Sequence, residues 1–368
     1  MKVLFAGGGT GGHVYPALAV AQLLTERDSN TEVLFVGTQK GLEHDLVPKA
    51  GFKLETVAAA GLKRRLTLAN LGVLGSNLRG FVQALKIVRR FRPHVVVGTG
   101  GYVAVPVVLA AAWLRVPILL HEQNALPGLA NRFLSRFAAC VAVSYEQAID
   151  YFPQARRIIV SGNPVRAGVW QKSRSEGRHC LELDDSARLI LVFGGSRGAR
   201  PITEATVAAA KRLLTDPKIV LLLVTGTADF VTIEEKVRRL GIQAQQAGKM
   251  LVRPYLYNME DALAAADVVV TRAGATTLAE ITARGIPAVL IPSPYVTANH
   301  QEHNARALAD NQAAVMIKQQ ELTGELLADT LQTLLADSER LANMTAAARA
   351  LGRRDAANIL TQEILRLI

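Results

Sequence analysis

The chain has 368 residues, of which half are hydrophobic and a fifth are charged. This composition fills globular cores and excludes a disordered, collagen-like or coiled-coil protein. Lysine and arginine outnumber aspartate and glutamate by 42 to 31, a formal net charge of +11, which indicates an anionic partner such as nucleic acid, a phospholipid surface or a phosphorylated substrate. The two cysteines, Cys140 and Cys180, are too few for a disulfide framework and favour a reducing compartment.

Short apolar strands alternate with helical segments through the first part of the chain. Strands are predicted at 3–6, 33–37, 95–97, 118–121 and 141–144, and a helix from about Pro16 to Arg27. The segment 93–114 lacks charged residues, but its central glycines and Pro106 favour a buried strand, a glycine loop and a buried helix over a membrane-spanning helix. The glycine-broken start does not have the pattern of a signal peptide.

The alternation pauses near residue 163 and then restarts. Later strands are predicted at 189–195, 220–226, 268–271 and 288–292, with a polar loop over 174–185 and mostly helix from 327 to 368. The first strands of the two halves echo each other, as VLFAGGGTGG and LILVFGGSRGA. We therefore predict an α/β fold of two Rossmann-like, doubly wound domains joined near residue 163, with the inter-domain cleft as the default ligand site.

Glycine-rich loops follow three of the predicted strands. Gly7–Gly12 reads G-x-G-x-x-G before a helix, where backbone N–H groups favour a phosphate. A dinucleotide site needs an acid near the end of the second strand, which here ends in VGTQ, and a P-loop needs lysine where this chain has His13. The loops 98–101 and 194–199 are also glycine-rich, the latter with a hydroxyl and a cation. Glycine serves tight turns too, but three such loops favour phosphate binding.

A further strand–helix junction, TRAGATT at 271–277, opens a helix with small residues. Its first N–H groups could hold a diphosphate, and Glu280, about one turn later, could accept hydrogen bonds from ribose hydroxyls. A helix with an ordinary capped N-terminus, whose dipole interacts favourably with the negative charge of Glu280, fits this segment equally well.

Two polar clusters, HEQN at 121–124 and NHQEHN at 299–304, follow predicted strands or open a helix. The spacing of His300 and His303 differs from H-E-x-x-H and no third ligand accompanies them, so we expect substrate contacts rather than a metal. The sequence also lacks a D-x-D pair, the usual carboxylates for a metal-bound nucleotide diphosphate. We expect no cofactor.

Positive charge is concentrated in one part of the first half. Between Thr56 and His121 there is no Asp or Glu, while nine cations lie among leucines and Trp113. We name the basic and apolar residues at 62–92 and 113–115 the basic-apolar patch and expect it to bind an anionic membrane surface. A solvated basic face is the alternative. Nucleic acid is disfavoured as a partner, because no aromatic residues interleave the cations for base stacking.

Seven segments run in order along nearly the whole chain: GGGTGGHVYPALAVA, VVGTGGYVAVP, HEQNALPGLANR, SGNPVR, FGGSRGA, RAGATTLAE and HQEHNA. Together they resemble the MurG family, the UDP-N-acetylglucosamine transferases of bacterial peptidoglycan synthesis. The resemblance implies the two-domain glycosyltransferase-B fold and transfer of GlcNAc from UDP-GlcNAc to the 4-hydroxyl of MurNAc in lipid I. The products would be lipid II and UDP, made by a peripheral enzyme on the cytoplasmic face of the bacterial plasma membrane.

The resemblance also implies boundaries and roles. An acceptor and membrane-binding domain would span 1–163 and include the C-terminal helix 345–368, and a UDP-GlcNAc-binding domain would span 164–344. The residues that would contact the donor are Thr10, Gly11, Gly12, Asn124, Arg166, Ser196, Leu256, Ala275, Thr276, Thr277, Leu278, Ala279, Glu280 and Gln301. Among them Arg166 and Ser196 would hold the diphosphate, Glu280 the ribose, Leu256 the uracil, and Asn124 and Gln301 the GlcNAc. Gly100, Gly101 and Tyr102 would shape the acceptor's pyrophosphate site.

The implied reaction is one in-line displacement with inversion, in which the acceptor hydroxyl loses a proton. His13 is a candidate for the general base, and Glu122 is the other candidate or the group that orients the base. The chain departs from the family at His300, where some members have Gln, and at Arg197, where Gln is common. The rival readings are a nicotinamide-dependent oxidoreductase, another sugar-nucleotide enzyme of this fold such as an epimerase or other lipid glycosyltransferase, and a basic nucleic-acid-binding protein.

Overall fold

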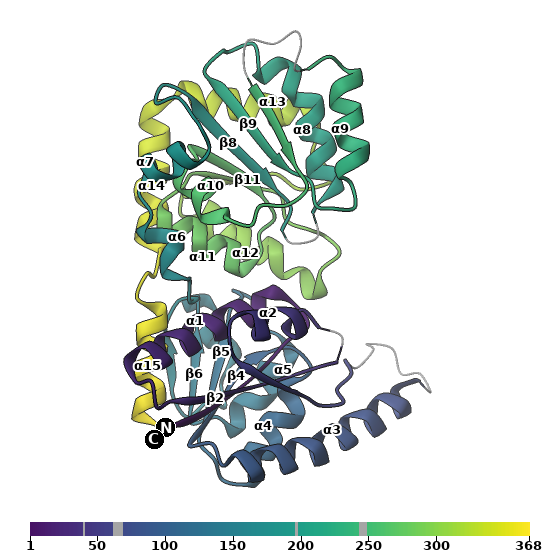
Figure 1. The fold of residues 1–368 in the computed structure, drawn as a ribbon, viewed down its shortest axis with the longest axis vertical. Helices are drawn as coiled ribbons and strands as arrows, with labels where there is room; N and C mark the ends of the chain where they lie inside the picture. Colours follow the sequence, from purple (N-terminus) through teal and green to yellow (C-terminus); the bar gives the residue numbers. More distant parts are fainter. Residues whose placement is uncertain (40, 62–68, 196–197, 243–248) are drawn as a thin grey trace. The chain divides into compact units, whose positions relative to one another are not determined.

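The computed structural model describes residues 1–39, 41–61, 69–195, 198–242 and 249–368. Contacts divide the chain into two compact units, which are treated separately below (Figure 1). Unit 1 comprises Met1–Val165 together with Arg353–Ile368, and unit 2 comprises Arg166–Gly352. Each unit is built on one parallel sheet with helices on its faces, so the two-domain α/β expectation is confirmed.

Unit 1 has a seven-stranded sheet in the order β3-β2-β1-β4-β5-β6-β7. Its strands are β1 (Lys2–Gly7), β2 (Glu32–Gly37), β3 (Lys53–Thr56), β4 (Val95–Gly100), β5 (Ile118–Glu122), β6 (Cys140–Val143) and β7 (Ile158–Val160). All neighbouring strands are parallel. The strand order reverses direction at β1 and β4, which is the place where doubly wound sheets bind ligands at the carboxyl ends of their strands.

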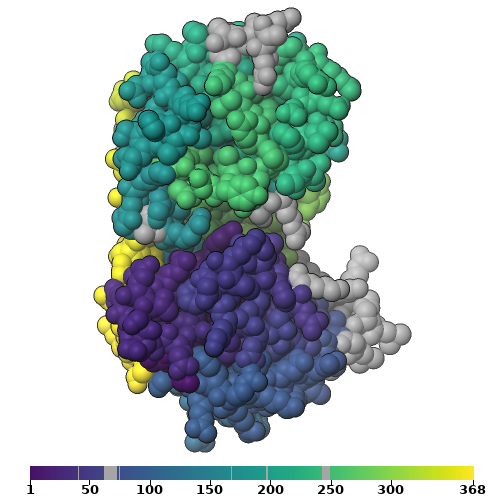
Figure 2. Space-filling view, viewed as in Figure 1, coloured from purple at the N-terminus to yellow at the C-terminus, as the bar shows by residue number. Residues whose placement is uncertain are grey.

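Helices cover both faces of this sheet. They are α1 (Gly11–Arg27), α2 (Glu43–Lys49), α3 (Ala69–Phe91), α4 (Ala104–Trp113), α5 (Leu129–Leu134), α15 (Ala356–Arg366) and the short η1 (Ser135–Phe137) and η2 (Glu146–Tyr151). Alternate residues of β1 enter different cores: Val3 and Phe5 pack with α1 and α15, and Leu4 and Ala6 pack with α3 and α4. The chain's last helix, α15, therefore lies beside the first, α1, where the yellow and purple surfaces meet (Figure 2).

Helix α1 begins at Gly11, so the expected start near Pro16 is wrong. Proline lacks an N–H and usually marks the first turn of a helix, but here it lies one turn further in and is tolerated. Thr10 has the extended backbone of an N-cap residue, with φ −136° and ψ 155°. The consequence is that His13 belongs to the first turn of a helix rather than to a loop.

Unit 2 has a six-stranded parallel sheet in the order β10-β9-β8-β11-β12-β13. Its strands are β8 (Arg188–Phe193), β9 (Ile219–Val224), β10 (Lys249–Arg253), β11 (Val268–Thr271), β12 (Ala288–Leu290) and β13 (Ala314–Met316). Its helices are α6 (Ala167–Gln171), α7 (Arg174–Cys180), α8 (Arg200–Leu213), α9 (Phe230–Arg239), α10 (Met259–Ala265), α11 (Ala275–Arg284), α12 (His300–Ala309), α13 (Gly324–Ala336), α14 (Ser338–Leu351) and the short η3 (Thr297–Asn299).

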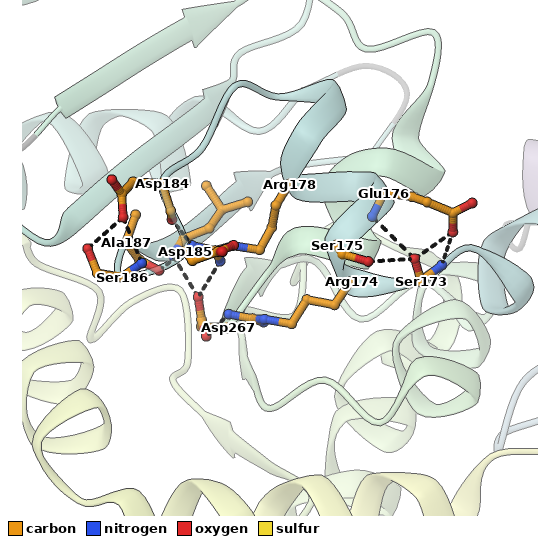
Figure 3. Close-up of polar contacts among 11 residues, drawn as sticks. Ser173, Arg174, Ser175, Glu176, Arg178, Asp184, Asp185, Ser186, Ala187 and Asp267 are labelled. Atoms are coloured by element: carbon orange, nitrogen blue, oxygen red, sulfur yellow. Dashed lines mark hydrogen bonds and ion pairs between the residues drawn. The ribbon is translucent and has the colours of Figure 1, made fainter.

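The polar segment 174–185 is not simply a loop, because its first part forms α7. Ser173 and Glu176 form a capping box in which each side chain bonds the other residue's backbone N–H. Asp267 then joins this helix to the sheet. It accepts from Arg174 at 2.7 Å (Figure 3). It also accepts from the backbone N–H of Leu189, in β8, at 2.7 Å. The S-x-x-E spacing of Ser173 and Glu176 is a helix-start signal that the loop prediction overlooked, and the network has a structural role.

In the part of the chain that the structure describes, the helices are all too short or too polar to cross a bilayer.

Candidate active site

The first cluster lies where β1, β4 and β5 end in unit 1. It comprises Thr10–His13, Gly100–Tyr102 and His121–Asn124, which come from three segments far apart in the sequence. The backbone of Gly101 and that of Gly8 approach so closely that a Cβ on Gly101 would overlap the Gly8 carbonyl. Tyr102, which is 40% exposed, extends towards Gly9. The parallel sheet thus brings together the acceptor-loop residues and His13, which the sequence had placed at two separate glycine loops.

The Nδ1 of His13 has two polar neighbours in unit 1. Its Nδ1 lies 3.0 Å from the carbonyl oxygen of Gly8 and 3.3 Å from Thr10 Oγ1. A carbonyl can only accept, so Nδ1 carries a proton, and in the neutral ring Nε2 then has the lone pair. The ring's Nε2 edge lies against Gly100, whose φ of +105° and lack of a side chain both make room for it. The arrangement gives His13 the tautomer that a general base needs.

Glu122 is buried, and four hydrogen bonds occupy its carboxylate. Its Oε1 accepts from the backbone and side-chain nitrogens of Asn124, at 3.0 and 3.1 Å. Its Oε2 accepts from the backbone of Gly128 at 3.1 Å and from Asn131 Nδ2 at 2.9 Å. A carboxylate with this many fixed donors organises the loop 122–131 and is poorly placed to take a proton from a substrate.

His121 is a second, fully buried histidine at the same sheet edge. Burial lowers its pKa to about 4, while its bond with the Gly162 carbonyl opposes that shift and the nearby His13 adds to it. Its Nε2 lies 3.0 Å from that carbonyl, and Gln123 Nε2 lies 3.1 Å from its Nδ1. His121 is therefore neutral at physiological pH and is committed to structure.

The second cluster lies in unit 2, at the carboxyl ends of β11 and β12. It comprises Arg166, the first residues of α11 (Ala275, Thr276, Thr277, Leu278, Ala279 and Glu280) and Gln301. The N-cap of α11 is Gly274, which has no side chain to cap the helix. Gln301 lies in the first turn of α12, and its Oε1 accepts from Ser293 N at 2.8 Å. Asn304 of the same helix donates to the Ala273 carbonyl at 3.2 Å, which ties α12 to the segment before α11.

Glu280 is the titratable group of this cluster. Desolvation raises its pKa to about 7, the positive charge of Arg166 pulls it back, and Glu260 raises it further. Loss of hydration is the larger effect, so the carboxyl changes its charge near neutral pH. A perturbed pKa on a helix that opens with free N–H groups is typical of a functional site.

Two other expected residues lie apart or outside. Leu256 lies after β10, next to Tyr255 and the 89% exposed Tyr257. In the sheet, β9 and β8 separate β10 from β11, so Leu256 is not part of the second cluster. Ser196 lies outside the described residues. The flanking Gly195 and Gly198 have φ of +88° and +75°, and a Cβ on Gly198 would overlap the carbonyl of Thr225. The backbone of this second glycine loop therefore requires glycine irrespective of any ligand.

The sequence reasoning missed Glu43. It is fully buried at the start of α2, and its Oε2 accepts from Gly9 N at 2.8 Å. Its Oε1 accepts from both the backbone and the hydroxyl of Thr38, each at 2.8 Å. The second strand is therefore followed by an acid, as in a dinucleotide-binding site. Here, however, the carboxylate accepts a hydrogen bond from a backbone N–H of the first glycine loop. The only sequence signal was the pair of glycines, Gly37 and Gly41, that make room for it.

Comparison with known proteins identifies the family of this chain. Residues 3–143 match the Glycosyltransferase family 28 N-terminal domain, and residues 189–360 match the corresponding C-terminal domain. A UDP-N-acetylglucosamine–N-acetylmuramyl-(pentapeptide) pyrophosphoryl-undecaprenol N-acetylglucosamine transferase of Desulforamulus reducens is 47% identical over 356 residues, covering 97% of this chain and 96% of the relative.

Solved structures agree with the sequence comparison. MurG of Acinetobacter baumannii has a TM-score of 0.79 and 29% identity, with 99% of each chain covered. A UDP-GlcNAc 2-epimerase of Neisseria meningitidis has a TM-score of 0.69 at 14% identity over the full length of both chains, a likeness of fold alone. Sequence identity therefore separates the two enzyme classes that the shared fold leaves open, and the chain belongs to the MurG family of GlcNAc transferases.

Proposed function

We propose that this chain transfers GlcNAc from UDP-GlcNAc to the 4-hydroxyl of the MurNAc in lipid I, giving lipid II and UDP. The observation that carries the proposal is the 47% identity to a transferase of that name, over nearly the full length of both chains. The geometry of the first cluster supports it, because a histidine with a fixed tautomer lies among the glycine loops of the unit-1 sheet.

The acceptor side of the reaction is assigned to unit 1. His13 Nε2 takes the proton of the 4-hydroxyl as that oxygen attacks the anomeric carbon of GlcNAc. Glu122 acts as a positioning residue, since its four hydrogen bonds fix Asn124 and the loop 122–131. Asn124 then contacts the GlcNAc, and Gly100, Gly101 and Tyr102 shape the site of the acceptor's pyrophosphate.

The first helix also takes part. The N–H groups of Gly11 and Gly12 open α1, and Thr10 precedes them with its hydroxyl beside His13. Backbone donors at a helix N-terminus favour negative charge, so these residues serve the sugar and diphosphate.

The donor is assigned to unit 2. The N-terminus of α11, Arg166 and Ser196 stabilise the charge that develops on the departing UDP. Glu280 accepts from the ribose hydroxyls, Leu256 contacts the uracil, and Gln301 contacts the GlcNAc. Thr276 supports a polar ligand here, because its buried hydroxyl has no hydrogen-bond partner among the described residues.

The basic-apolar patch is proposed to dock the enzyme on an anionic membrane. Residues 62–68 of the patch lie outside the described residues. In α3, Leu78, Val82, Lys86 and Arg89 follow one another at helical spacing and are all exposed, Leu78 to 65%. Trp113, at the end of the neighbouring α4, is 72% exposed. Apolar side chains with cations beside them suit a lipid surface, where each cation adds about 1 kcal/mol. With this docking, the proposed reaction takes place at the cytoplasmic membrane face, where the lipid acceptor is embedded.

Product analysis tests the proposed reaction directly. Incubation with UDP-GlcNAc and a lipid I analogue should add one β-linked GlcNAc to the MurNAc 4-hydroxyl, as shown by mass and NMR of the purified product. An epimerised sugar nucleotide with an unchanged acceptor would contradict the proposal and favour the epimerase reading.

A further inference from the structure

One peptide unit in the first glycine loop is bonded at both ends by ionisable side chains. The Gly8–Gly9 peptide donates its N–H to Glu43 Oε2 at 2.8 Å, and its carbonyl oxygen lies 3.0 Å from His13 Nδ1. The N–H and the carbonyl belong to one planar, conjugated amide. Glu43, the peptide and His13 therefore form a continuous hydrogen-bonded chain that ends at the imidazole.

The surroundings of Glu43 are built for a carboxylate in this position. The side chain has no exposed surface, and Thr38 donates to its other oxygen through both its N–H and its hydroxyl. A Cβ on Gly8, Gly37 or Gly41 would overlap atoms of the Glu43 side chain. Gly8 of the first glycine loop and the two glycines at the end of β2 and before α2 thus leave the volume that the Glu43 side chain fills.

We propose that Glu43 is a positioning residue that acts on His13 through the Gly8–Gly9 peptide; this rests on the proposed role of His13 as the base. A carboxylate at the N–H end of an amide polarises it and makes its carbonyl oxygen a stronger acceptor. The strengthened carbonyl holds the Nδ1 proton of His13, which keeps the lone pair on Nε2 and stabilises the imidazolium formed during transfer. The arrangement serves the purpose of the acid–histidine pair in a catalytic triad, with a peptide interposed.

The first test uses Glu43→Gln, which keeps the size of the side chain and places an NH2 group against donors. We expect kcat to fall about 10- to 100-fold, the range seen when an outer hydrogen-bond partner of a metal-binding histidine is removed. The KM for UDP-GlcNAc should change by less than kcat does, because most of the residues assigned to the donor lie in unit 2. Unchanged kcat in a folded variant would overturn the proposal.

Glu363→Gln is the matched control. Glu363 is also a buried glutamate of unit 1, but it lies on α15 and pairs with Arg157 at 2.6 Å. The same substitution there should lower the melting temperature and leave kcat unchanged. If Glu363→Gln lowers kcat as much as Glu43→Gln does, the effect is one of general stability and the proposal fails.

A double-mutant cycle separates this proposal from that of the base. If Glu43 acts through His13, then Glu43→Gln should reduce kcat in the wild type but have no further effect in a His13→Ala background. A His13→Ala variant with full turnover would remove the base and this inference with it. The other outcome is that His13→Ala is impaired and that adding Glu43→Gln to it lowers kcat by the same factor as in the wild type. That outcome would overturn the Glu43 proposal alone.

The tautomer of His13 gives a readout that needs no turnover. In the full chain with 15N-labelled histidine, His13 is assigned by its absence in the His13→Ala spectrum. The wild type should show a protonated Nδ1 and an unprotonated Nε2. Glu43→Gln should shift the ring towards the tautomer that is protonated at Nε2. An unchanged tautomer would overturn the proposal. If Glu43→Gln does not fold, Thr38→Val, which removes one donor to Glu43, should move the 15N shifts in the same direction by a smaller amount, and unmoved shifts would again overturn it.

Discussion

The carboxylates of the two clusters are held in opposite ways. In unit 1, fixed donors hold both glutamates of the site region: three bonds reach Glu43 and four reach Glu122. In unit 2, desolvation exceeds the help that Glu280 receives from Arg166, and its pKa rises to about 7. Unit 1 is therefore organised before any ligand arrives, whereas Arg166 only partly offsets the desolvation of the unit-2 acid, and donors from a ligand would stabilise its charged form further.

The largest expected effect comes from the organised cluster. His13→Ala should lower kcat by about three orders of magnitude, within the range for loss of a general base or acid. Its affinity for UDP should stay within about twofold of the wild type, because most of the residues assigned to UDP lie in unit 2 and His13 is not among the donor contacts. The measurement is steady-state turnover together with calorimetric UDP binding, and full turnover by a folded His13→Ala variant would remove His13 as the base.

The loop scaffold comes next. Glu122→Ala leaves the donors on Asn124, Gly128 and Asn131 without their acceptor, and each buried unpaired group costs about 1–3 kcal/mol. We expect a lower melting temperature and about a 10- to 100-fold loss of kcat/KM for the acceptor, by analogy with lost outer partners of functional side chains.

Glu122→Gln refines this test. It retains one acceptor and should recover part of both the stability and the activity. A base would not be rescued by an amide, so activity as low in Glu122→Gln as in Glu122→Ala, with stability restored, would assign the base to Glu122.

The pH dependence of UDP binding tests the role of Glu280 in unit 2. If the charged form of Glu280 accepts from the ribose hydroxyls, UDP affinity should rise as pH increases through about 7. A group with that pKa gives about a tenfold change between about pH 6 and 8. Glu280→Gln should bind UDP more weakly at high pH and lose this dependence; the same pH slope in the variant would contradict the assignment.

The stability of the ligand-free protein should change with pH in the opposite direction. Because its folded-state pKa of about 7 lies above the ordinary value of 4.5, folded Glu280 holds a proton that the unfolded chain has lost. Its contribution to stability is therefore present below pH 4.5 and declines as pH rises towards 7. Denaturation of wild type and Glu280→Gln across this window isolates the effect, and parallel curves would contradict it.

The smallest expected effect is on membrane binding. Trp113→Ala should weaken binding to vesicles of anionic lipid several-fold, because an exposed aromatic ring loses its contact with the interface. Val231→Ala, a truncation of a 64% exposed apolar side chain in unit 2, is the matched control and should bind like the wild type. Sedimentation with vesicles measures both, and equal binding by the Trp113 and Val231 variants would argue against the patch.

The inner strands could be predicted from the sequence because parallel strands buried on both faces read as short apolar runs, as in Val95–Val97. The described edge strands β3, β7, β10 and β13 were missed, because they are less buried and carry weaker apolar runs. The start of the helix that contains His13 was predicted too late, since Pro16 marks a helix start more often than an interior. Helix α7 was missed because its polar surface hid a capping box.

The site divides in the same way. His13, Glu122 and Glu280 could be named as candidate site residues because they lie at glycine loops, polar strand ends and helix starts, whose positions follow from the alternation of strands and helices. The bonds that set their chemistry could not be anticipated. Glu43 reaches Gly9 across 34 residues and His121 reaches Gly162 across 41, and such contacts depend on tertiary packing.

UDP release from UDP-GlcNAc, measured with and without a lipid I analogue and in the presence of EDTA, tests the central claim most directly. We expect release that requires the acceptor and persists in EDTA, because the α11 N-terminus, Arg166 and Ser196 are proposed to stabilise the charge of the departing diphosphate. Release without the acceptor, or none with it from a folded protein that binds UDP, would contradict the assignment of this chain as a lipid I transferase.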